Sequence, residues 1–96
     1  MNRNLQFIGF EPTETLAEFC ASKYSQIYGY APSDSFPVGA LKKVDQGYAG
    51  SLEIRSRHGT FVAESSGTNP KDIVSQISED INSQLLEWKK HRFDLD

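Results

Sequence analysis

A long amphipathic segment near the end of the chain, residues 70–92, constrains the fold more than any other feature. Its apolar side chains recur at three- and four-residue intervals: Ile73, Val74, Ile77, Ile81, Leu85 and Trp88. This spacing over more than four turns predicts a helix with one buried face. Asn69 suits the N-cap, and Pro70 suits the first helical position because its missing N–H has no partner there anyway. Basic residues at the end suit the helix dipole.

A second amphipathic helix is predicted at residues 14–28. One face carries Leu16, Phe19, Cys20, Tyr24, Ile27 and Tyr28, interrupted by Lys23. We expect Tyr24 and Tyr28 to pack in the core. Thr13 fits the N-cap, and a capping box of Thr15 with Glu18 is the alternative start. Gly29 fits the C-cap, since Pro32 prevents the helix from continuing.

Four segments have the composition of strands. They are residues 4–10, 36–44, 48–57 and 60–66. Pro37 and Gly39 predict an irregular or bulged start to the second strand. Residues 45–47 have the form of a three-residue hairpin loop with Gly47 at the position that needs a positive φ.

His58-Gly59 predicts a two-residue turn between the last two strands, and that turn sets a register. It puts Arg57 opposite Thr60 and Glu53 opposite Glu64, a like-charge pair. It assigns one face of the hairpin to the core, with Leu52, Ile54, Phe61 and Ala63. The other face, which carries Arg55 and Arg57, remains exposed.

The predicted element order is therefore β-α-β-β-β-α. A helical crossover allows the first two strands to be parallel, and the last three form an antiparallel meander. We expect an α+β, two-layer sandwich whose four-stranded mixed sheet carries both helices on one face. The 96 residues suit a single domain, residues 1–96.

Composition and motifs exclude several function classes. The net charge of −3 argues against a strongly electrostatic nucleic-acid binder when totals alone are considered. Cys20 is the single cysteine and cannot form an internal disulfide, so a cytoplasmic location is expected. No apolar run approaches the ~20 residues of a membrane span. His58 and His91 lack a third ligand at metal spacing, and no catalytic motif is present. We expect no enzyme activity, no cofactor or metal, and no small-molecule substrate.

Three stretches are similar to a known family. Phe7-Ile8-Gly9 is followed by Thr13-Glu14-Thr15-Leu16, and the last helix has apolar residues at similar intervals and a Lys/Arg/His end. Residues 51–67 match in spacing at Leu52, Ile54, Gly59, Phe61, Ala63 and Gly67. The chain resembles the ribosome hibernation-promoting factor and ribosome-associated inhibitor family, in the short form without a C-terminal dimerisation domain. It departs from the family in its acidic last helix, with Glu79, Asp80 and Glu87.

The resemblance implies a fold similar to double-stranded RNA-binding domains. It also implies a factor that occupies the decoding region of the small ribosomal subunit, blocks messenger and transfer RNA, and stabilises idle ribosomes under stress. The candidate RNA-binding residues are basic: Lys42, Lys43, Arg55, Arg57, His58, Lys89, Lys90, His91 and Arg92. Of these, Lys43, Arg55 and Arg57 are expected on the outer face of the strands. Such side chains neutralise phosphates and release counterions. The simpler interpretation is a solvated sheet face and a basic helix end that stabilises the helix dipole.

Two functions from different classes follow. The first is a translation inhibitor that binds small-subunit ribosomal RNA through a basic sheet face and a helix end. The alternative is a protein–protein interaction or regulatory module that keeps the fold but has lost RNA binding. A protein partner and a weak homodimer both remain open.

Overall fold

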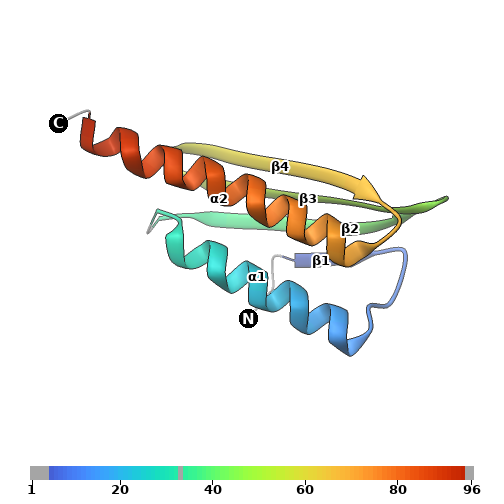
Figure 1. Ribbon diagram of the computed structural model, residues 1–96. Helices are drawn as coiled ribbons and strands as arrows, with labels where there is room; N and C mark the ends of the chain where they lie inside the picture. Colours follow the sequence, from blue (N-terminus) through green and yellow to red (C-terminus); the bar gives the residue numbers. More distant parts are fainter. Residues whose placement is uncertain (1–4, 33, 95–96) are drawn as a thin grey trace.

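Four strands and two helices make up the computed structural model, in the order β-α-β-β-β-α (Figure 1). The structure describes residues 5–32 and 34–94, with the backbone alone at residues 30 and 91–94. The elements are β1 (Leu5–Ile8), α1 (Glu14–Tyr30), β2 (Phe36–Val44), β3 (Gly47–Ser56), β4 (Gly59–Gly67) and α2 (Pro70–Asp94).

The strands form one sheet in the order β1-β2-β3-β4. β1 is parallel to β2, and the other two pairs are antiparallel. Both helices lie on the same side of this sheet (Figure 1). The predicted class, a two-layer α+β sandwich with a mixed four-stranded sheet, is therefore confirmed.

α1 begins as one of the two predicted alternatives. The Leu16 N–H donates to Thr13 Oγ1 at 3.1 Å, so Thr13 is the N-cap rather than Thr15. The predicted C-cap is wrong: the helix continues through Gly29 to Tyr30 and ends at Ala31, which is extended. Pro32 explains this end, because a residue that precedes proline is pushed out of the helical region.

α2 begins where predicted. The Lys71 N–H donates to Asn69 Oδ1 at 3.0 Å, and Pro70 is the first helical residue. The residues at intervals of four in α2 are all buried in the core: Ile73, Ile77, Ile81 and Leu85. Val74 and Trp88 pack partly buried against them.

The core lies between the helices and the inner face of the sheet. Leu16, Cys20 and Ile27 of α1 are buried in it, and Tyr24 packs against it. The prediction that Tyr28 packs there is wrong, since Tyr28 is 52% exposed. At 100° per residue Tyr28 lies about 120° around the helix from Leu16, beyond the edge of the buried stripe.

The β3–β4 hairpin has the predicted faces but a different turn. Ser56 pairs with Gly59, so the two-residue turn is Arg57-His58, one residue earlier than predicted. Ser56 Oγ accepts the His58 N–H at 3.2 Å and donates to the Gly59 carbonyl at 3.0 Å. Gly59 itself has a φ of 135°.

The predicted register is consequently wrong by two residues. Glu53 lies opposite Val62, not opposite Glu64, and no like-charge pair forms there. A shift of two preserves the faces of both strands, because side chains alternate with a period of two. The predicted core residues of this hairpin are accordingly buried: Leu52, Ile54, Phe61 and Ala63.

The β2–β3 hairpin differs from its prediction as well. Val44 pairs with Gly47, which leaves a two-residue turn at Asp45-Gln46. Among the described residues the positive φ values belong to Gly9 and Gly59, not to Gly47. Gly47 serves close approach instead, since a Cβ there would lie 2.2 Å from the Gly67 carbonyl oxygen.

β2 is regular from its first residue, so the predicted bulge is wrong. Its pairing with β3 runs unbroken from Phe36 to Val44. Leu5, where the described part of β1 begins, pairs with Gly39 of β2. Pro37 therefore sits near the start of the strand, where its missing N–H disturbs the sheet least.

Candidate nucleic-acid interface

The candidate basic residues divide between the two ends of the sheet. Lys42 and Lys43 lie beside the β2–β3 turn, whereas Arg57 and His58 form the β3–β4 turn. β3 separates these turns with 10 residues, or about 30 Å. The predicted residues therefore do not form one continuous surface.

One end of the sheet meets the last part of α2. The rings of His58 and Trp88 lie 5.3 Å apart, so the β3–β4 turn is beside the segment that carries Lys89 and Lys90. Arg57 and His58 of the turn and Lys89 and Lys90 of α2 therefore lie near the same end of the sheet, here called the turn–helix end. Lys90 is exposed and Lys89 is half-buried.

A carboxylate anchors the β3–β4 turn from the loop before β2. Asp34 Oδ2 accepts the Arg57 N–H at 2.8 Å and lies 3.5 Å from Arg57 Nε. This backbone hydrogen bond holds the pKa of Asp34 below its ordinary value, and the Arg57 charge adds to the effect. The Arg57 side chain stays 88% exposed, so its guanidinium remains accessible to a ligand.

Trp88 joins the turn to the core. It is half-buried, and its ring lies 6.4 Å from the Phe61 ring in an edge-on arrangement. Trp88 belongs to the apolar stripe predicted for this helix, and it packs against the core. Through Trp88 the turn and the end of α2 are held in a fixed relation.

Arg55 lies on the outer face of the sheet, the face opposite the helices, but its charge is engaged. Arg55 Nε is 3.1 Å from Glu53 Oε2, and Arg55 Nη2 donates to Glu53 Oε1 at 3.3 Å. The side-chain hydrogen bond with Glu53 raises the pKa of Arg55. Arg57 is also near a carboxylate, but its one side-chain contact with Asp34 is longer, at 3.5 Å, and so Arg55 is the weaker attractor of phosphate.

Lys43 was predicted on the outer face, and that prediction is wrong. Lys43 pairs with Tyr48, and its Nζ lies 4.7 Å from the centre of the Tyr48 ring, which packs against the core. In a strand that buries Leu41, alternation puts Lys43 on the helix side and Lys42 on the outer face. Lys42 is exposed there.

His91 and Arg92 complete the predicted basic end of the helix. Both belong to α2, but their side chains lie outside the described part of the chain. Their role stays a prediction.

Sequence reasoning missed a basic pair in the helix layer. Lys23 Nζ of α1 and Lys71 Nζ of α2 lie 5.6 and 5.7 Å from the centre of the same Phe19 ring. The i, i+4 spacing of Phe19 and Lys23 in a predicted helix is a sequence signal that these two side chains are neighbours. The approach of Lys71 depends on how the helices pack, which the sequence does not reveal.

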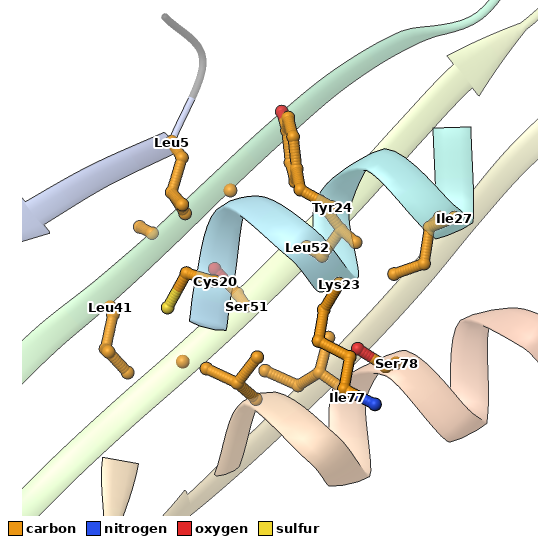
Figure 2. Close-up of a pocket in the computed structure, with 14 residues that line it drawn as sticks. Leu5, Cys20, Lys23, Tyr24, Ile27, Leu41, Ser51, Leu52, Ile77 and Ser78 are labelled. Atoms are coloured by element: carbon orange, nitrogen blue, oxygen red, sulfur yellow. The ribbon is translucent and has the colours of Figure 1, made fainter. Parts of the chain in front are cut away.

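A small, partly open cavity of about 40 Å³ lies between the helices and the sheet (Figure 2). Its lining is largely apolar and includes Leu41, Leu52 and Ile77. Burial raises the pKa of the Cys20 thiol and that of the Tyr24 hydroxyl, and no described residue hydrogen-bonds to this hydroxyl. The volume is far below the ~300 Å³ of a typical ligand pocket, so this cavity is a packing defect rather than a substrate site.

Two further observations apply to residues 5–32 and 34–94. Within these ranges, His, Cys, Asp and Glu side chains nowhere gather in threes in a way that could hold a metal ion. Neither α1 nor α2 is both long and apolar enough to span a membrane.

Comparison with known proteins identifies solved structures that share this fold. No protein-family model matches the chain, and no curated protein matches its sequence. Among solved structures, a ribosomal subunit interface protein from Coxiella burnetii matches with a TM-score of 0.73. That match has 12% sequence identity and covers 91% of this chain and 96% of the other.

The N-terminal domain of Thermus thermophilus Protein Y matches with a TM-score of 0.62 and 12% identity. The match covers 95% of this chain and 99% of that domain. The chain has the fold of these proteins. The resemblance seen in the sequence is thereby confirmed for the architecture.

Proposed function

We propose that this protein binds the small ribosomal subunit through its RNA and inhibits translation when growth slows. The observation that carries this proposal is the match to a ribosomal subunit interface protein over 91% of the chain and 96% of the match. With a partner of this kind, we expect the protein to act in the cytoplasm.

The turn–helix end supplies the chemistry for RNA contact. Arg57 presents an exposed guanidinium, whose donors suit phosphate oxygens, on a turn that Asp34 anchors. Lys90 adds a second exposed cation from α2. Arg55 contributes less because Glu53 already holds it, and Lys42 lies at the far end of the sheet. Folded RNA would be recognised by shape and phosphate position.

Few ionic contacts should give a shallow salt dependence. Each phosphate that is neutralised contributes roughly −0.7 to −0.9 to the slope of log affinity against log salt. A site built on about three cations predicts a slope of roughly −2 to −3. This modest dependence is compatible with a chain whose net charge is −3.

Co-sedimentation of the purified protein with small ribosomal subunits across a salt series tests the proposal. We expect binding at low salt that weakens as salt increases. An absence of binding by the wild-type protein at low salt would overturn the proposed function.

A pair of double variants tests the site. Arg57→Ala with Lys90→Ala should abolish binding without changing the thermal midpoint, because Arg57→Ala keeps the backbone N–H that Asp34 accepts. Lys42→Ala with Lys71→Ala is the matched control: it removes the same charge at positions away from the turn–helix end and should leave binding intact. The reverse result would keep the function but move the site to the other cations.

The alternative function is a protein-interaction module that keeps the fold without RNA binding. It is favoured by the Glu53–Arg55 pair, which neutralises a cation on the sheet face, and by the net charge of −3. Glu79 and Asp80 are moreover exposed on α2. This alternative predicts no co-sedimentation with subunits at any salt concentration.

A further inference from the structure

The outer face of the sheet exposes apolar side chains that no element covers in the described part of the chain. Both helices lie on the opposite face (Figure 1). Phe36 and Val38 of β2 are 55% and 40% exposed, and Val62 of β4 is 46% exposed. A cluster of exposed apolar residues on a sheet face often marks an interaction surface.

Strand register arranges this surface in two adjacent rows. Phe36, Arg55 and Thr60 are cross-strand neighbours in the first row. Val38, Glu53 and Val62 are neighbours in the second. The Arg55–Glu53 ion pair thus joins the two rows at the middle strand.

We propose that these two rows form a homodimer interface in which two copies of the sheet pack face to face. The two-fold axis runs across the strands, midway between the two rows. The first row of one copy therefore faces the second row of the other copy. Phe36 then lies on Val38 of the second copy, and Thr60 lies on Val62. Arg55 lies on Glu53 of the second copy, and Glu53 lies on Arg55.

Charge selects this arrangement over the other symmetric one. An axis parallel to β3 would put Arg55 on Arg55 and Glu53 on Glu53, and such like-charge contacts oppose association. In the arrangement proposed, every charge meets its opposite, as a self-complementary two-fold interface requires. Two sheets that pack face to face cross at about 30°. This rotation displaces the residues near the two-fold axis least.

The same rows are poorly suited to RNA. Their one cation, Arg55, and their one anion, Glu53, cancel, and the remaining residues are apolar or hydroxylic. Phosphate binding needs an excess of positive charge. A neutral surface with apolar flanks suits a protein partner, and its two-fold complementarity points to a second copy.

The contact area indicates a weak dimer. Three strands and two rows cover about 14 Å by 14 Å, which gives on the order of 200 Å² per copy. That is about a quarter of the ~800 Å² per partner in a standard stable interface. Association is therefore expected only at high micromolar concentration or above.

This inference is independent of the proposed function, because the dimer rows contain no residue of the turn–helix end. Sedimentation velocity over about 10 μM to 1 mM protein tests it. The wild-type sedimentation coefficient should increase with concentration towards that of a dimer. Val38→Lys should remain monomeric over the same range.

A charge swap provides the decisive variants. Glu53→Arg and Arg55→Glu should each weaken association at least tenfold, since each single change leaves like charges opposed. The double variant Glu53→Arg with Arg55→Glu restores opposite charges across the axis and should associate like the wild type. Glu79→Arg, a matched change exposed on α2, should have no effect. Circular dichroism melting verifies that each variant is folded.

Three results would overturn the inference. They are a wild-type protein that stays monomeric to 1 mM, single variants that associate like the wild type, and a folded swap variant that does not recover. Co-sedimentation of Val38→Lys with ribosomal subunits keeps the proposals apart, because loss of dimerisation should leave subunit binding unchanged.

Discussion

The two faces of β3 show how one strand serves two purposes. Leu52 and Ile54 point inward and are buried beneath the helices, whereas Glu53 and Arg55 alternate with them and point outward. The inward residues have neighbours on every side, and the outward pair interacts mainly with itself. The inner face therefore determines whether the chain folds, and the outer face determines what the folded chain associates with.

The largest contrast should come from truncating one residue on each face. Ile54→Ala removes a side chain with 0% exposure and should lower the free energy of unfolding by about 2–5 kcal/mol, through lost burial and a residual cavity. Val62→Ala on the outer face should cost less than about 1 kcal/mol, because half of that side chain already contacts water. Urea denaturation measures both values. Equal losses would mean that the faces are not distinct.

A variant that fails to fold would leave the first contrast unmeasured, so a smaller change accompanies it. Ile54→Val should cost about 0.5–1.5 kcal/mol.

Glycine substitutions sharpen the contrast at a finer scale. In Gly47→Ala the new Cβ would lie 2.2 Å from the Gly67 carbonyl oxygen, and the backbone must shift. Overpacking of this kind should cost about 1–3 kcal/mol. Gly29→Ala is the matched control, since the residue is in a helix and no described atom beyond its chain neighbours and the helix backbone lies within 4 Å of its Cβ position. It should stabilise the protein by about 0.5–1 kcal/mol.

The same chemical change should thus shift the thermal midpoint down at Gly47 and up at Gly29. A shift of the same sign at both positions would show that propensity, rather than space, decides the outcome.

The faces of the sheet were predictable because they depend on period alone. Alternation assigned Leu52, Ile54, Phe61 and Ala63 to the core even though the predicted register was wrong by two residues. The start of α2 was predictable for a similar reason, since Asn69 and Pro70 act on adjacent backbone groups. Features that depend on local spacing are encoded locally.

The turns and the site were less predictable because they depend on contacts between distant residues. Gly59 favoured a turn at His58-Gly59, but Ser56 and Asp34 hold the turn at Arg57-His58. Asp34 lies 23 residues from Arg57 in the sequence, so no local pattern reveals their contact. The sequence supplied the basic residues, whereas their grouping at the turn–helix end requires the packing of Trp88 on His58.

The exposed edge of β4 offers a test of intermediate size. Gln84 of α2 donates from Nε2 to the Val62 carbonyl at 2.8 Å and accepts the Val62 N–H at its Oε1 at 3.3 Å. The side-chain amide thereby takes the place of a neighbouring strand. Asp80 Oδ1 accepts from Gln84 Nε2 at 3.1 Å and orients it.

Gln84→Ala should cost about 1 kcal/mol and expose the edge to pairing with other chains. Hydrogen exchange at the Val62 amide should become faster, and Ser83→Ala, at the preceding position of α2, should leave that exchange rate unchanged. An unchanged Val62 rate in Gln84→Ala would show that the edge is protected in another way.

The smallest effect is expected at the rim, where the loop before β2 meets the β3–β4 turn. The pKa of Asp34 is lowered in the folded state, chiefly by the hydrogen bond from the Arg57 backbone. A carboxyl group with a lowered folded pKa stabilises the protein above its unfolded pKa. That contribution disappears as pH falls through the folded pKa. Asp34→Asn should therefore reduce the thermal midpoint slightly near neutral pH and make no difference in strong acid.

Arg57→Ala separates the two causes of this pH dependence, since it removes the guanidinium but keeps the backbone N–H. If the backbone hydrogen bond dominates, Arg57→Ala should retain most of the pH-dependent change in thermal midpoint that Asp34→Asn abolishes. Thermal melting from about pH 2 to pH 7 measures both. If the melting profiles of Arg57→Ala and Asp34→Asn coincide, the pH dependence arises from the ion pair instead. The anchor of the turn would then depend on the Arg57 side chain, which RNA binding must also use.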